Sequence, residues 1–133
     1  MTTETYAGAA DAVAALAEPP YYAIIHPWSA VTFVHGKPTL ADLQRAVGGD
    51  IEPLPIDIIQ THGEAITAYC NERGKIDGMR PNPVATRVLL GATADVWCIA
   101  GPVVIIGGPD ADGEDTPLSA EWRMRLVREI AEA

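Results

Sequence analysis

The residues best suited to chemistry lie in one basic segment, residues 71–87. It holds four of the nine basic residues of the chain, which are Arg73, Lys75, Arg80 and Arg87. Two acidic residues accompany them, so the segment has a net charge of +2, whereas the whole chain has −9 and the remainder therefore −11. Guanidinium groups bind phosphates and carboxylates through paired hydrogen bonds. The segment is therefore predicted to hold an anionic small molecule or a protein partner.

A predicted helix start lies inside this segment. Asn82 followed by Pro83 is typical of an N-cap and a first helical position. The backbone N–H groups at a helix N-terminus attract anions, although proline supplies none. The predicted ligand-binding residues are Arg73, Lys75, Arg80, Asn82 and Thr86. The same residues also fit a solvated turn that is followed by a capped helix and holds no ligand.

No catalytic residue, metal site or cofactor is predicted. Cys70 and Cys98 have no CxxC spacing, and the three histidines lack the i, i+4 spacing of a helical zinc pair. The acidic residues 110–115 resemble a calcium loop, but their glycine is at the wrong position. An enzyme acting on a phosphorylated small molecule is one alternative, with His62 or Asp77 as its general base. A structural or assembly protein is the second alternative.

Size and composition indicate a single soluble domain. The chain has 133 residues, of which 48% are hydrophobic and 20% charged. The sequence shows no transmembrane stretch and no secretory signal, so we expect a cytoplasmic protein that does not enter membranes. A net charge of −9 argues against nucleic acid as a partner.

The sequence predicts strands and short helices in mixed order. A β-hairpin is predicted from the apolar runs 21–25 and 30–35, with Trp28 in its turn. An indole at a hairpin tip is hard to bury in a small domain, so Trp28 is predicted to lie in an interface with a partner or a second copy. The other predicted elements are helices at 9–17, 40–47, 83–90 and from Ser119, an edge strand within 50–56, a strand at 65–70 and a central strand within 95–106.

These elements predict an α+β fold. It has a mainly antiparallel sheet of four to five strands with helices on one face, because consecutive strands can pair locally and no regular βαβ alternation occurs. The predicted organisation is a helical appendage at 1–20, a core at 21–118 and a C-terminal helix at 119–133.

The order of several motifs resembles a known family, the phage and actinobacterial domain of unknown function 3846. The motifs are His26-Pro27, Thr39–Gln44, Val47–Glu52, Asn71–Lys75, Pro81–Thr86 and Gly101–Val104. The resemblance spans residues 23–118 and carries no assigned activity. It implies a phage accessory protein, and with the basic segment it favours a binding module that modulates host defence.

Overall fold

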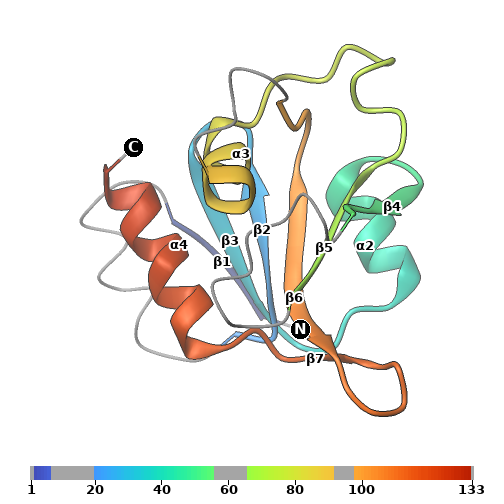
Figure 1. The fold of residues 1–133 in the computed structure, drawn as a ribbon, viewed down its shortest axis with the longest axis vertical. Coiled ribbons are helices and arrows are strands. Elements are labelled where there is room, and N and C mark those ends of the chain that lie inside the picture. The colour runs from blue at the N-terminus through green and yellow to red at the C-terminus, as the bar shows by residue number, and fades with distance from the viewer. Residues whose placement is uncertain (1, 7–19, 56–65, 92–97, 133) are drawn as a thin grey trace.

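An antiparallel sheet runs through the protein, which we describe from a computed structural model (Figure 1). The structure describes residues 2–6, 20–55, 66–91 and 98–132. The strands of these residues follow the order β1-β3-β2-β6-β5-β4, and β7 also pairs with β6. They are β1 (Thr2–Tyr6), β2 (Tyr22–His26), β3 (Ala30–His35), β4 (Ile51–Pro53), β5 (Ile66–Asn71), β6 (Val103–Pro109) and β7 (Asp115–Thr116).

The core lies on both faces of β6. Val103 and Ile105 face one apolar cluster, and Val104 and Ile106 face the other. All four side chains are fully buried, which explains why this strand has a continuous apolar run rather than alternating polar residues. The prediction of a central strand is therefore confirmed for these residues.

Helices cover the sheet on two faces. Helices α3 (Pro83–Leu90) and α4 (Ala120–Glu132) pack on the cluster that contains Ile25 and Phe33. Helix α2 (Leu40–Val47) packs through its apolar side chains on the opposite cluster, with Tyr22 and Val34. The α+β fold with an antiparallel sheet is confirmed, but the placement of all helices on one face is not. The reason is that β2 and β6 are apolar on both faces, and each face needs a cover.

Local capping signals explain the ends of α2. The Thr39 hydroxyl accepts a hydrogen bond from Asp42 N, and the Asp42 carboxylate accepts one from Thr39 N, so the two residues form a capping box. Gly48 ends the helix with φ 81°, in the left-handed region that favours glycine. These bounds agree with the predicted helix, as do those of α3.

The N-terminal residues differ in part from the prediction. Residues 2–6 form β1, which pairs antiparallel with β3, whereas the sequence placed them in a helical appendage. The predicted helix at 9–17 lies outside the described residues. The prediction of an edge strand near Pro53 is confirmed, because β4 pairs with β5 alone among the described strands.

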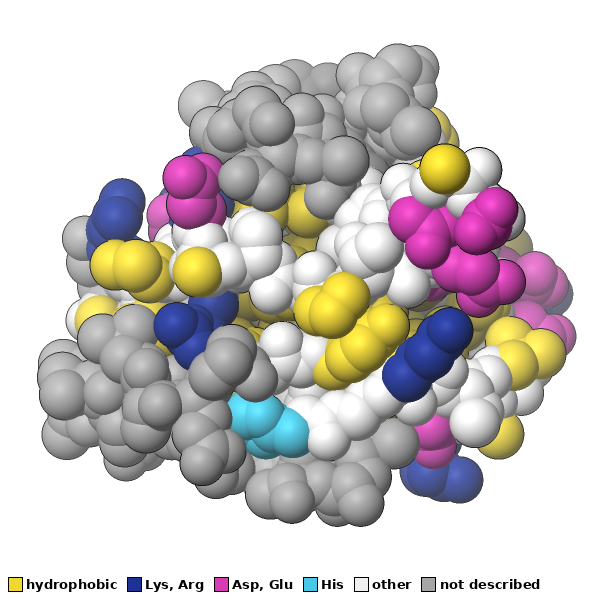
Figure 2. Space-filling view, turned by 90° about the horizontal axis from the view of Figure 1, so that it is seen from below, with side chains coloured by type: hydrophobic (Ala, Val, Ile, Leu, Met, Phe, Trp, Pro, Cys, Tyr) yellow, Lys and Arg dark blue, Asp and Glu magenta, His cyan; other side chains and the backbone are white. Residues whose placement is uncertain are grey.

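The two ends of the sheet carry different charges. The β2–β3 turn, the loop after β5 and the start of β6 share one end, because β6 pairs antiparallel with both β2 and β5. The opposite end carries Asp110, Asp112 and Glu114 on the β6–β7 loop, and Figure 2 shows acidic side chains gathered there. Lys37 approaches this loop and pairs with Glu114 at 3.5 Å.

Candidate functional site

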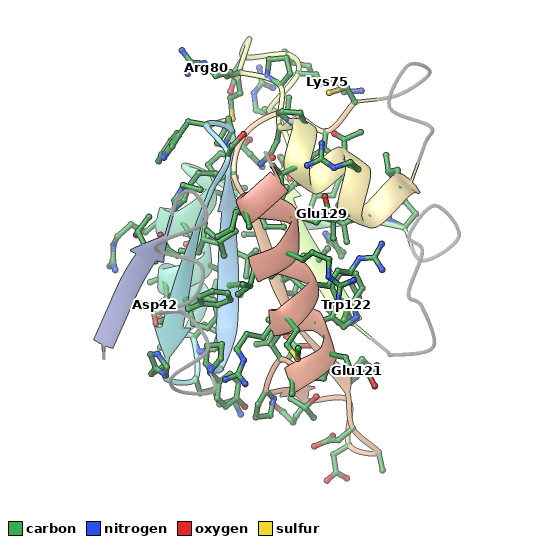
Figure 3. All side chains as sticks on the ribbon, turned by 90° about the vertical axis from the view of Figure 1, so that its left-hand side faces the viewer. Asp42, Lys75, Arg80, Glu121, Trp122 and Glu129 are labelled. Atoms are coloured by element: carbon green, nitrogen blue, oxygen red, sulfur yellow. The ribbon has the colours of Figure 1, made fainter. Side chains whose placement is uncertain are left out.

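The candidate site is the end of the sheet that carries both the β2–β3 turn and the loop 72–81. Exposed apolar and basic side chains share this end, and Figure 3 shows Arg80 and Lys75 there. We call this group the apical surface, and its residues are Trp28, Arg73, Lys75, Ile76 and Arg80. The backbone holds the loop against the sheet, since Gly101 N donates to Arg80 O at 2.8 Å.

Two basic residues of the segment, Arg73 and Arg87, form ion pairs within the described part of the chain. Arg73 pairs with Asp77 at 3.4 Å, and both side chains are more than half exposed. Arg87 donates to the Glu129 carboxylate of α4 at 2.6 Å, far from the loop in sequence. The charge excess of the segment is therefore smaller in the folded protein than in the sequence, because Asp77 and Glu129 offset the charges of Arg73 and Arg87.

Asn82 and Thr86, which the sequence placed in the ligand site, are structural. Both side chains are 0% exposed. The Asn82 side chain donates to the carbonyl oxygens of Ile25 and Gly101 and accepts from Ala85 N. The Thr86 hydroxyl donates to Asn82 O and accepts from Ile99 N. Because these polar groups already have partners inside the protein, neither side chain can contact a ligand in this arrangement.

The N-terminus of α3 is closed to anions for the same reason. The N–H groups of Ala85 and Thr86 donate to the side chain and the carbonyl of Asn82. Pro83 has no N–H group, and Val84 is 1% exposed. The prediction that this helix terminus binds an anion is therefore corrected. The N–H groups that an anion would need already donate to the N-cap residue.

Trp28 contacts a neighbouring ring although 59% of it is exposed. Its ring stacks on His26 with a centroid distance of 4.4 Å and an interplanar angle of 14°. The next residue, Ser29, has φ 61°, which is strained for a residue other than glycine. The prediction that this indole is not buried in the domain is confirmed, and its partner stays a prediction.

Sequence reasoning missed Ile76. Its side chain is 74% exposed at the tip of the loop 72–81. The available signal was a single large apolar residue among charged and glycine residues in a predicted turn. Together with Trp28, it gives the apical surface two apolar side chains beside its cations.

Cys70 is not an activated thiol. Its Sγ donates to Glu52 O at 3.6 Å. Burial, followed by the charge of Glu52, raises the pKa of the thiol to about 11. Nucleophilic catalysis needs the thiolate, so this environment argues against a catalytic role.

Alkylation of Cys70 by iodoacetamide is expected to be slow at pH 8 and to rise as the pH approaches 11. The physical reason is that the thiolate fraction follows the raised pKa. Peptide mass spectrometry of a Cys98→Ser variant measures the rate, with a reference peptide whose thiol ionises near the ordinary value of 9.0. Alkylation of Cys70 as fast as that of the reference at pH 8 would contradict this assignment.

The other chemical alternatives have less support. The general bases considered for an enzyme are His62 and Asp77. His62 lies outside the described residues, and Asp77 already pairs with Arg73.

Metal binding finds no support in the described ranges, where no group of three His, Cys, Asp or Glu residues is arranged to hold a metal ion. In the acidic loop, the Asp110 carboxylate accepts from Asp112 N and Glu114 N, so it shapes its own turn. None of the helices that the structure describes has the length and apolar character needed to cross a bilayer.

Comparison with known proteins gives one match. Residues 22–131 match the model of a family described as Domain of unknown function (DUF3846). The match begins at β2 and includes most of α4, so it extends past residue 118, where the resemblance in the sequence ended. Neither the curated proteins nor the solved structures that were compared with the chain gave a match.

Proposed function

Because the chain belongs to the DUF3846 family, whose description carries no activity, we propose from the geometry that it is a binding protein that docks a protein partner on its apical surface. The supporting observation is the exposure of Trp28 and Ile76 at the same end of the sheet as Arg80 and Lys75. Tryptophan and arginine are the residues that most often dominate the binding energy of protein interfaces.

Charge indicates the kind of partner. The loop 72–81 has three basic and two acidic residues and thus a net charge of +1, whereas the chain as a whole has a net charge of −9. An acidic surface is therefore attracted to this end and repelled by most of the rest of the molecule. The partner that fits is a protein with acidic side chains around an apolar pocket for Trp28. A host protein that is inhibited by a phage accessory protein would be a partner of this kind.

A Trp28→Ala substitution is expected to weaken partner binding by about 2 kcal/mol, or roughly 30-fold, because an anchoring indole is lost. The free energy of unfolding should change by about 0.5 kcal/mol or less, since the side chain is mostly exposed. Proteins retained by the immobilised chain from its natural source would be purified and titrated by calorimetry.

Two further variants make the test specific. Arg80→Glu should weaken binding by at least tenfold through charge reversal. Leu40→Ala should leave it unchanged, because Leu40 has the same 59% exposure as Trp28 but begins α2, which follows the opposite end of β3. A partner whose affinity is the same for all four proteins would overturn the proposal. Retention of only a small anion, or of a second copy, in native mass spectrometry would do the same.

A further inference from the structure

A continuous chain of contacts connects β1 to the exposed indole. The Thr5 and Thr32 hydroxyl oxygens are 2.5 Å apart, and Thr32 Oγ1 lies 2.7 Å from His26 Nε2. His26 in turn stacks on Trp28. Thr5 and Thr32 are directly opposite each other across β1 and β3, so this contact follows from the strand register.

We propose that β1 positions Trp28 for binding, with Thr5 as a positioning residue that acts through Thr32 and His26. The consequence for a partner rests on the function proposed above. The positioning itself concerns only residues of this chain. It extends the binding site to a strand that precedes the family match at residues 22–131.

Hydrogen-bond directionality explains how a hydroxyl on β1 can act on the indole. Each threonine hydroxyl has one proton, so a proton donated by Thr5 to Thr32 leaves the Thr32 proton for His26 Nε2. Burial lowers the pKa of His26, which favours the neutral ring that can accept this bond. Thr32 is 8% exposed although Thr5 is exposed, so water can reach the Thr32 hydroxyl only from the side of β1.

The fixed imidazole then provides the plane on which the indole stacks. The strained φ of Ser29 indicates that the turn does not select this orientation by local preference alone. Holding a contact side chain in its bound orientation reduces the entropy that is lost on binding. A flexible Trp28 would therefore bind the same partner less tightly.

Fluorine NMR of protein labelled with 5-fluorotryptophan tests this positioning without a partner. Thr5→Val is expected to shift the Trp28 resonance toward that of free 5-fluorotryptophan and to narrow it, while the resonance of the buried Trp122 stays in place. Thr5→Ser restores the hydroxyl and should restore the original resonance. Thr3→Val is the matched control, because Thr3 pairs with Val34 rather than with Thr32.

A second substitution covers the case in which Thr5→Val prevents folding. His26→Phe keeps a ring beside the indole but removes the bond to Thr32, and it should release Trp28 in the same way. An unchanged Trp28 resonance in Thr5→Val or His26→Phe, or an equal shift in Thr3→Val, would overturn the proposal. A shift in Thr5→Val that Thr5→Ser reverses supports the positioning even if Trp28→Ala has no effect on binding, and in that case only the proposed function fails.

Discussion

Replacing Asn82 with alanine is expected to lower the free energy of unfolding by about 3 kcal/mol. The cap on Ala85 N contributes about 1 kcal/mol, and the carbonyl oxygens of Ile25 and Gly101 each lose a buried donor at about 1 kcal/mol or more. The side chain is 0% exposed, so water cannot replace these bonds without rearrangement. Urea denaturation with an unchanged m-value measures the loss.

Two other variants separate the contributions at Asn82. Asn82→Asp can still accept from Ala85 N but donates to neither carbonyl when ionised. Burial raises the pKa of the introduced carboxyl, so the folded state binds more protons and the variant should gain stability as the pH falls below neutral. Thr39→Ala removes an exposed cap of the same kind and should cost only about 1 kcal/mol. Equal losses in Asn82→Ala and Thr39→Ala would show that the two carbonyl contacts contribute nothing.

Gly107→Ala is expected to destabilise the protein by about 3 kcal/mol, the upper end of what overpacking usually costs. A methyl group at this position would lie against Pro117 O and within 2.6 Å of Thr116 O, both of which are backbone atoms. Because backbone atoms cannot rotate away, β7 would have to leave β6. The glycine is therefore required by this close approach.

Tyrosine ionisation reports whether β7 moves in this variant. Tyr69 donates to the Asp115 carboxylate at 2.8 Å, and burial followed by this contact raises the pKa of Tyr69 to about 12. Ultraviolet titration of Gly107→Ala should show that pKa falling toward the ordinary value of 10.0. Gly113→Ala is the control, since its φ of 81° is strained for alanine but no atom lies within 4 Å of the added methyl group. It should leave the pKa of Tyr69 unchanged.

Predictions from sequence succeeded where the signal lay within a few residues. The capping pair Thr39 and Asp42, the exit at Gly48 and the pair Asn82-Pro83 defined α2 and α3 because helix ends need partners for their own backbone groups. The β2–β3 hairpin was predictable for a similar reason, as its two apolar runs are separated by a short turn.

The candidate site was harder to predict because its chemistry depends on distant partners. Arg87 contributes to the positive charge of the segment in the sequence, yet Glu129 pairs with it from 42 residues away. The sequence predicts that Asn82 caps the helix and can also bind a ligand, whereas in the fold its side chain is buried and donates to Ile25 and Gly101. The rest of the chain decides whether a polar side chain can bind a ligand or is buried and hydrogen-bonded inside the protein.

The sequence by itself determined the α+β class, the helix ends, the central strand and the basic character of the segment 71–87, because these follow from local hydrogen bonding, side-chain periodicity and composition. The tertiary structure alone decided that α2 lies across the sheet from α3 and α4, that residues 2–6 pair with β3, and that Trp28 and Ile76 share one end with Arg80. These outcomes depend on strand order and register, which bring together side chains that no local pattern connects.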